Sequence, residues 1–185
     1  MNIFALHKNP RIAASMMCDK HIVKMIVETN QLLSAVLDLN YKPEHITEED
    51  ENGYHVSGEL GLASYPKAHR KHGCTLWAAE ARDNYRWLCR HLQWMCYEYT
   101  KRYGKIHSLE NRLMIYRGQE QHLNFKRKTM TPFYQGMPED VKNEDYVKAY
   151  RDYYNKYKFT FAKWKDNNIP YWYNPPKYEV VLEAA

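Results

Sequence analysis

One short segment of the sequence carries a base, amines and carboxylates at helical spacing: CDKHIVKMIVETNQLL, residues 18–33. His21, Lys24 and Glu28 follow one another at steps of three and four, so a helix would place them on one strip of its surface. Such groups can exchange protons, and a desolvated lysine can attack an electrophilic carbon. The same spacing is equally typical of a solvated helix face that carries a Lys24–Glu28 ion pair.

A helix over residues 19–39 would position this strip. Asn9 before Pro10 predicts the start of a shorter helix ahead of it, because an asparagine cap followed by proline at the first helical position is a common helix start. That helix should end near Met17, with a break near Cys18 and Asp19. The other stripe of helix 19–39 is aliphatic and should face the core, through Ile22, Ile26, Leu33, Val36 and Leu37.

Three more helices are predicted downstream. The longest covers residues 75–103, with apolar residues at steps of three and four, and closes at Gly104 as the left-handed cap residue. Another covers residues 109–123, with Ser108 as its cap, and the last covers residues 143–165. Strand signals are nearly absent. The predicted fold class is therefore mostly α, a single-domain helical bundle over residues 1–185.

Long polar segments separate these helices. Residues 40–64 are acidic and rich in glycine, which predicts an inserted surface loop. Residues 65–74 and 124–138 are predicted to form basic loops. Residues 166–185 are rich in proline and aromatic residues, which predicts an extended C-terminal tail.

Composition limits the class of protein. The chain has 185 residues, of which 44% are hydrophobic and 26% charged, as in a soluble globular domain. No apolar run approaches the roughly 20 residues needed to span a bilayer, and no secretory signal is visible, so we expect no membrane contact and a cytoplasmic location. The four cysteines form no CxxC pair, which predicts reduced thiols and no disulfide framework.

The charge distribution predicts a polyanionic partner. The net charge is +5, but residues 42–60 hold six acids, whereas residues 65–128 hold fourteen Lys and Arg against five acids. A basic half with seventeen tyrosines and five tryptophans favours nucleic acid, because bases stack on aromatic rings. We expect no metal or cofactor. The candidate DNA-binding residues are His69, Arg70, Lys71, His72, Arg82, Arg86, Lys126, Arg127 and Lys128.

Two parts of the sequence resemble the small helical phage pyrimidine-dimer DNA glycosylases, also called endonuclease V. Asp19-Lys20-His21, followed by Glu28, resembles that family's Asp-x-His with a catalytic Glu seven residues after the His. Residues 83–104 resemble the family's long helix, and Trp164 with residues 171–173 resembles its aromatic C-terminus. Enzymes of that family bend DNA, flip a nucleotide and attack the sugar C1′ with their own α-amine, and the resemblance implies related chemistry for this chain.

The resemblance implies Glu28, His21 and Asp19 as site residues, and the charged stripe of this chain adds Lys24 and Lys20 as candidates. In the family the initiator Met is removed ahead of a small residue, whereas Asn2 predicts that Met1 is retained here. The family's arginines beside the catalytic Glu also have no counterpart in this chain. Lys24 or Lys20 is therefore an alternative Schiff-base nucleophile, with Glu28 stabilising an oxocarbenium-like sugar and His21 as its acid–base partner.

The resulting hypothesis is a monomeric phage-type DNA glycosylase or glycosylase/lyase. It would act without a cofactor on a flipped, damaged or modified pyrimidine nucleotide of double-stranded DNA, in the host-cell cytoplasm. Two alternatives remain open at this point. One is a base-hypermodification enzyme on the same scaffold, and the other is a phage protein that binds DNA without catalysis.

Overall fold

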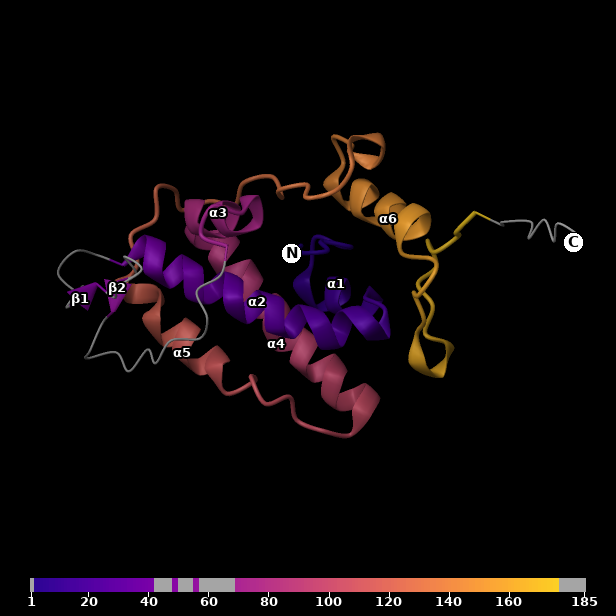
Figure 1. Cartoon of the computed structure of the whole chain (residues 1–185), viewed down its shortest axis with the longest axis horizontal. Helices are drawn as coiled ribbons and strands as arrows, with labels where there is room; N and C mark the ends of the chain where they lie inside the picture. Colours follow the sequence, from indigo (N-terminus) through magenta and orange to yellow (C-terminus); the bar gives the residue numbers. More distant parts are fainter. Residues whose placement is uncertain (1, 42–47, 50–54, 57–68, 177–185) are drawn as a thin grey trace, which may run out of the picture.

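The computed structural model describes residues 2–41, 48–49, 55–56 and 69–176 (Figure 1). Helices dominate these ranges, which confirms the mostly α class. A two-residue antiparallel pair, β1 and β2, lies in the predicted loop 40–64, and the rest of that loop after Tyr41 is outside the described residues. Short 3-10 turns, η3, η4 and η5, connect the helices. The bounds are α1 Pro10–Met16, α2 Asp19–Asn40, β1 Glu48–Glu49, β2 His55–Val56, α3 Gly73–Glu80, α4 Arg82–Tyr103, α5 Arg112–Gln119, η3 Glu120–His122, η4 Glu139–Val141, α6 Tyr146–Tyr157 and η5 Lys165–Asn167.

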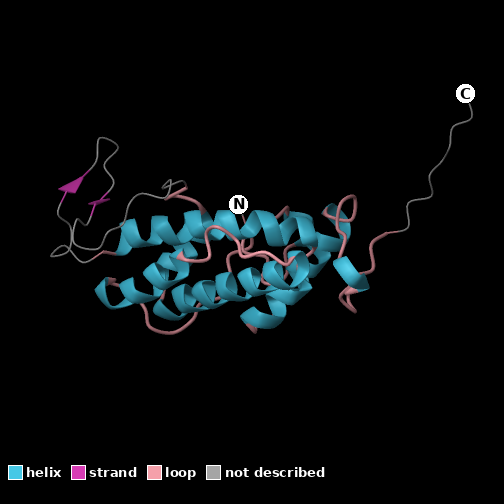
Figure 2. Cartoon of the chain, turned by 90° about the horizontal axis from the view of Figure 1, so that it is seen from below, coloured by secondary structure: helices cyan, strands magenta, loops and turns pink. Residues whose placement is uncertain are grey.

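The two longest helices, α2 and α4, pack against each other and lie in separate layers (Figures 1 and 2). Both contain 22 residues, so each is about 33 Å long at 1.5 Å per residue. The aliphatic stripe predicted for α2 is confirmed. Burying one such side chain stabilises the fold by roughly 1.5–3 kcal/mol. The fully buried side chains at this interface include Ile22, Ile26, Leu33 and Val36 of α2 and Leu88, Leu92 and Met95 of α4.

Several predicted helix ends are confirmed by their caps. The Asn9 side chain accepts a hydrogen bond from the Arg11 N–H at 2.9 Å, with Pro10 at the first helical position. The predicted break falls between Met16 and Asp19. Gly104 has φ 64° and closes α4 in the left-handed conformation, which costs glycine little.

The predicted single helix over residues 75–103 is wrong. α3 and α4 are two helices joined at Ala81, whose backbone is extended (φ −132°, ψ 143°). Ala81 forms a parallel bridge with Arg127: the Arg82 N–H donates to the Arg127 carbonyl at 3.0 Å, and the Arg127 N–H donates to the Glu80 carbonyl at 3.2 Å. A distant segment therefore breaks the helix where no local residue would.

The last two predicted helices are shorter than expected. α5 begins at Arg112 and ends at Gln119, and Ser108 does not cap it. α6 covers Tyr146–Tyr157, and its N-cap Asp145 accepts from the Val147 N–H at 2.9 Å. The prediction of residues 109–123 and 143–165 as full helices is therefore wrong at these ends.

The described part of the C-terminal tail is extended apart from turns and is anchored by aromatic rings. The Trp164 and Tyr173 rings are 4.5 Å apart, and the Trp172 ring meets Tyr154 edge-on at 5.8 Å. Residues 177–185 lie outside the described residues.

The N-terminal segment, residues 2–6, is buried throughout. The Arg151 Nε donates to the Leu6 carbonyl at 3.1 Å, and the Trp87 indole N–H donates to the Lys8 carbonyl at 2.7 Å. The beginning of the chain is thus fixed between α4 and α6.

The four cysteines, Cys18, Cys74, Cys89 and Cys96, are free and buried, which confirms the prediction of unpaired thiols. Across the described residues, no helix is both long and apolar enough to cross a bilayer.

Candidate active site

The start of the chain, α2 and the beginning of α3 meet on one side of the bundle (Figure 1). Asn2 is only 5% exposed and has two anchors. Its side-chain oxygen accepts from the Ile3 N–H at 2.8 Å, and its amide nitrogen donates to the Gly136 carbonyl at 2.9 Å. Satisfying a buried amide in this way holds the N-terminal residues in one place.

Glu28 lies on α2 beside this anchored segment. Its side chain is 15% exposed and lies 3.1 Å from the Lys24 Nζ, whose side chain is 63% exposed. The predicted Lys24–Glu28 pair is therefore confirmed. The Glu28 carboxylate is therefore the more buried member of the pair, and Lys24 extends into solvent.

Two side chains at the start of α3 respond to both Glu28 and the chain's N terminus. Burial lowers the pKa of His72, the positive charge of the N terminus and of His69 lower it further, and Glu28 opposes them. Burial raises the pKa of the Cys74 thiol to about 12, and Glu28 adds to this while the N-terminal charge acts against it. The Glu28 carboxylate and the N-terminal charge therefore both act on the side chains of His72 and Cys74, at the start of α3.

Tyr134 forms a wall of this volume. A Cβ on Gly73 would lie 2.2 Å from the Tyr134 ring, and one on Gly136 would lie 3.3 Å from it. The ring also meets His72 edge-on, with centroids 6.2 Å apart. A side chain at position 73 would displace the Tyr134 ring, whereas one at position 136 would need only a small shift of the ring. Tyr134 is 44% exposed.

A groove of about 810 Å³ continues from Gly73 and Tyr134 along α3. Its floor is aromatic, because the buried Trp77 ring stacks on Phe133 at 4.7 Å. Apolar and basic side chains line it together, including Leu39, Leu76, Trp77, Pro132, Lys126 and Arg127. Stacking surfaces beside cations suit a nucleotide.

The prediction that His21 shares an exposed strip with Lys24 and Glu28 is wrong. His21 is 5% exposed and stacks on Phe4 with ring centroids 4.2 Å apart. Its Nδ1 shares a short hydrogen bond with the Tyr154 hydroxyl. Burial, followed by the nearby lysines at 158, 24 and 20, lowers its pKa to about 3, so the ring is neutral at pH 7. The His21 ring packs as part of the core, and its role as an acid–base partner stays a prediction.

Asp19 and Lys20 lie toward the other end of α2. Asp19 accepts from the Arg102 Nη1 at 3.0 Å, and Arg102 also contacts Glu98 at 3.2 Å, so Asp19 takes part in a largely buried ion-pair network. Nine residues separate Asp19 from Glu28, about 13.5 Å along the helix. The Lys20 Nζ lies 4.7 Å above the Phe161 ring.

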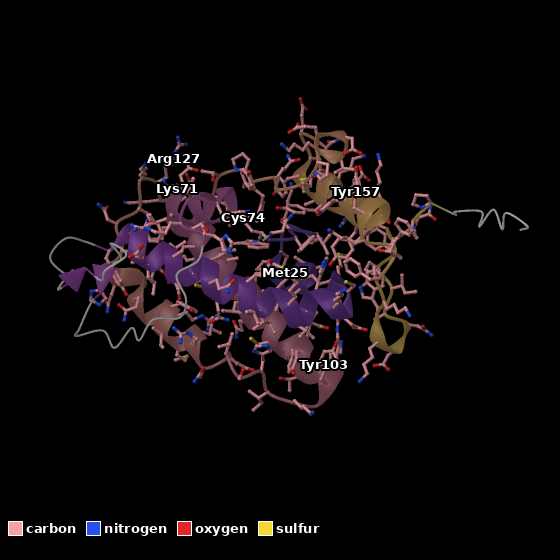
Figure 3. The ribbon with its side chains drawn as sticks, in the orientation of Figure 1. Met25, Lys71, Cys74, Tyr103, Arg127 and Tyr157 are labelled. Carbon is pink, nitrogen blue, oxygen red and sulfur yellow. The ribbon has the colours of Figure 1, made fainter. Side chains whose placement is uncertain are left out.

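The predicted DNA-binding residues do not form one surface. Lys126 and Arg127 line the α3 groove, and Figure 3 shows Arg127 and Lys71 on the α3 side of the molecule. Lys71, Lys126 and Lys128 are exposed and have no ion pair among the residues the structure describes. His69 is exposed and His72 half-buried.

The arginines among these candidates make internal ion pairs. Arg70 lies 2.8 Å from Asp38, and Arg127 lies 3.2 Å from Glu80. Arg82 and Arg86 pair with Glu120 beside α5, so the structure separates them from the groove.

Sequence reasoning missed two residues near the site. Nothing in the sequence around Cys74 distinguishes it from the other cysteines. It comes close to Glu28 because α3 packs against α2. Lys158 acts on His21 and lies 4.3 Å above the Tyr153 ring, although it is far from α2 in sequence. No local pattern could have identified either residue.

A family model for pyrimidine dimer DNA glycosylases matches residues 1–111. No curated protein and no solved structure matches the chain. The matched range contains α1 to α4 and therefore Glu28, His72 and Cys74.

Proposed function

The chain belongs to the pyrimidine dimer DNA glycosylase family, and on that premise we propose that it releases a damaged or modified pyrimidine base from a nucleotide flipped out of duplex DNA. The observation that carries this proposal is the position of Glu28, whose carboxylate is 15% exposed, lies 3.1 Å from the Lys24 Nζ and follows His21 at the family's interval of seven residues. An amine beside a half-buried carboxylate can attack a sugar carbon and stabilise the positive charge that develops there. The chain would act as one helical DNA-processing domain.

In the proposed reaction the uncharged N-terminal amine donates its lone pair to C1′ of the flipped nucleotide. The bond from C1′ to the base nitrogen breaks, and the base leaves with the bonding electrons. Glu28 takes the proton lost by the amine and passes it to the departing base. The C1′–O4′ bond of the sugar then breaks as the amine nitrogen forms a double bond to C1′, and O4′ takes a proton from solvent. The strand can be cleaved by elimination from the resulting protonated Schiff base.

Lys24 is less suited to be the nucleophile than the N-terminal amine. Its Nζ lies 3.1 Å from the Glu28 carboxylate and its side chain is 63% exposed, so Lys24 forms a surface ion pair and not a desolvated nucleophile. We propose instead that Lys24 holds a phosphate near the reacting sugar. Lys20 and Lys158 would extend this contact along the same edge.

The α3 groove is proposed to hold the flipped nucleotide. Its volume of about 810 Å³ falls within the roughly 300–1,000 Å³ typical of small-molecule sites. Tyr134 at its mouth offers a partly exposed ring for stacking, and Lys126 and Arg127 lie where they could meet phosphates.

Borohydride trapping tests this function. The purified chain would be incubated with duplexes containing a pyrimidine dimer, an abasic site or no lesion, and reduced in place. We expect a covalent adduct with the first two duplexes, mapping by mass spectrometry to the N-terminal residue, and base release only from the dimer. Because Asn2 disfavours removal of the initiator, the adduct should lie on Met1. An adduct on Lys24 would reassign the nucleophile, and neither adduct nor base release with any lesion would overturn the proposed function.

A further inference from the structure

Four arginines gather on the outer side of α4 and on α5; together they are called the arginine face. Arg82, Arg86 and Arg90 follow at steps of four on α4, and Arg117 lies on α5. The three on α4 extend over about 12 Å of helix at 1.5 Å per residue. Arg86 and Arg90 are exposed and lie two residues to either side of the buried Leu88, so they lie on the opposite side of α4 from this core residue.

The arginine face is only partly neutralised. Glu120 lies 2.7 Å from the Arg86 Nη2 and 3.8 Å from the Arg82 Nε. Asp83 lies 3.8 Å from Arg86. Within the described part of the chain, Arg90 and Arg117 pair with no carboxylate; the Arg117 Nη2 donates to the Gln93 side chain at 2.5 Å. Four guanidinium groups thus face two carboxylates.

One guanidinium nitrogen of this face lacks a hydrogen bond. The Arg82 Nε is buried and donates to no acceptor in the described structure, since Glu120 is too far away to accept. The Arg82 side chain as a whole is 40% exposed, so its guanidinium group keeps capacity for an oxyanion.

The surface between these arginines is hollowed rather than convex. Arg86, Arg117 and Glu120 line two adjoining depressions, of about 550 Å³ and about 450 Å³. Arg90 and Cys89 close the first, and Arg82 with Gly118 closes the second. A chain of phosphates could therefore lie along the groove between α4 and α5.

We propose that the arginine face binds the phosphodiester backbone of a second DNA segment. Guanidinium groups bind phosphates through two parallel N–H donors, which suits a site where arginines outnumber the carboxylates of Glu120 and Asp83. The row of about 12 Å on α4 is long enough to contact more than one phosphate of a strand. The arginine face and the α3 groove share no lining residue, although Arg82 borders both, since its N–H donates to the Arg127 carbonyl at 3.0 Å. One chain would then hold two stretches of DNA at once.

Counting bound duplexes tests this proposal. Short undamaged duplexes would be titrated into the full chain at low salt, with native mass spectrometry for stoichiometry and calorimetry for the two affinities. We expect two duplexes per wild-type chain and one per Arg90→Ala/Arg117→Ala chain. Neither substitution removes the partner of a carboxylate, so the fold should be retained. Binding of the second duplex to the wild type should depend on salt with a slope, d log K/d log[salt], about 2 larger in magnitude than that of any second binding event in the variant.

The matched control is Lys142→Ala/Lys148→Ala, which removes the same charge from exposed positions near α6. It should still bind two duplexes. A wild-type chain that saturates at one duplex would overturn the proposal, as would an arginine variant that still binds two with unchanged affinity. If inorganic phosphate shifts the NMR signals of Arg90 and Arg117 while only one duplex binds, the face takes small oxyanions and the proposal also fails. The duplexes carry no lesion, so a failure of base excision would leave these results unaffected.

Discussion

Glu28 pairs with a lysine on its own helix and acts on two side chains at the start of α3, His72 and Cys74. The ion pair with Lys24 is half in solvent and contributes little to stability, at most about 1 kcal/mol. The position of the carboxylate therefore has more bearing on chemistry than on folding.

Glu28→Gln should slow the chemical step by about two to four powers of ten, because the amide can neither take a proton nor stabilise a cationic sugar. DNA binding should persist or tighten, since a negative charge leaves a surface that meets phosphates. The free energy of unfolding should change by roughly 0.5 kcal/mol or less. Single-turnover kinetics and a melting curve measure these effects, with Glu139→Gln, another lysine-paired carboxylate, as control. Full activity in Glu28→Gln would end the catalytic assignment.

Replacing His21 would show whether this residue serves packing or catalysis. Its pKa is lowered to about 3, so the unfolded chain binds a proton there near pH 6.5 while the folded chain does not. The stability from the neutral ring is fully present above pH 6.5 and is lost as the pH falls toward 3. His21→Gln should cost about 1–3 kcal/mol at pH 7 and should lose less stability than the wild type on acidification.

Thermal unfolding across this pH range measures the effect on stability. The buried His91, whose pKa is lowered to about 4, is common to both proteins and cancels in the comparison. Single-turnover rates above pH 6.5 should be nearly equal. A loss of rate as large as that of Glu28→Gln would instead support the acid–base role.

At the scale of elements, the sequence predicts what is decided locally. The Asn9 cap, the Gly104 cap and the aliphatic stripe of α2 all follow from near neighbours, and the sequence predicts all three. It does not predict the break at Ala81, because the extended backbone there is paired with Arg127, far along the chain. Nor does it predict the contact made after α6, where the Lys163 carbonyl accepts from the Asp19 N–H at 2.9 Å, because the tyrosine periodicity carries no sign of this distant partner.

The same limit applies to the candidate site. The Lys24–Glu28 pair is a spacing within one helix and is predictable from it. The closeness of Glu28 to Cys74, and the burial of His21 under Phe4, depend on packing between segments and could not be read from spacing. Helical spacing in the sequence shows which residues share one face of a helix. It does not show which distant segment packs over that face.

A pair of glycines tests the wall made by Tyr134. Gly73→Ala places a Cβ 2.2 Å from the Tyr134 ring, so the ring must move and the fold should lose about 1–3 kcal/mol. Gly118→Ala, inside α5 with no atom within 4 Å, should instead gain roughly 0.5–1 kcal/mol. Chemical denaturation measures both. Adding Tyr134→Ala to Gly73→Ala should recover part of the loss, and no recovery would mean that another contact opposes the methyl group.

At the scale of the whole molecule, positive charge lies on two sides of the bundle. Lys71, Lys126 and Arg127 lie on the α3 side, near the groove, and the arginine face lies on the outer side of α4. Long-range attraction would draw DNA to either side, whereas Glu28 acts on His72 and Cys74 at the start of α3, on the first side.

Replacing Lys126, Arg127 and Lys128 together with Ala should weaken binding of one damaged duplex and flatten its salt dependence. Each phosphate that is no longer neutralised changes the slope by about 0.9, so the slope of the triple variant should be smaller by roughly 2 to 3. Arg127 contributes least, because it is already paired with Glu80. Fluorescence anisotropy at several salt concentrations measures the slope. An unchanged slope would remove this loop from the interface.

The burial of all four thiols has a practical consequence for labelling. Burial raises the pKa of Cys74, Cys89 and Cys96 to about 12, and it also raises that of Cys18, so almost no thiolate is present near neutral pH. Maleimide dyes should therefore leave the native protein almost unmodified. A cysteine introduced by Met114→Cys, at a position 71% exposed on α5, would react alone. One fluorophore could then report on DNA arriving at the molecule without removal of a single native cysteine.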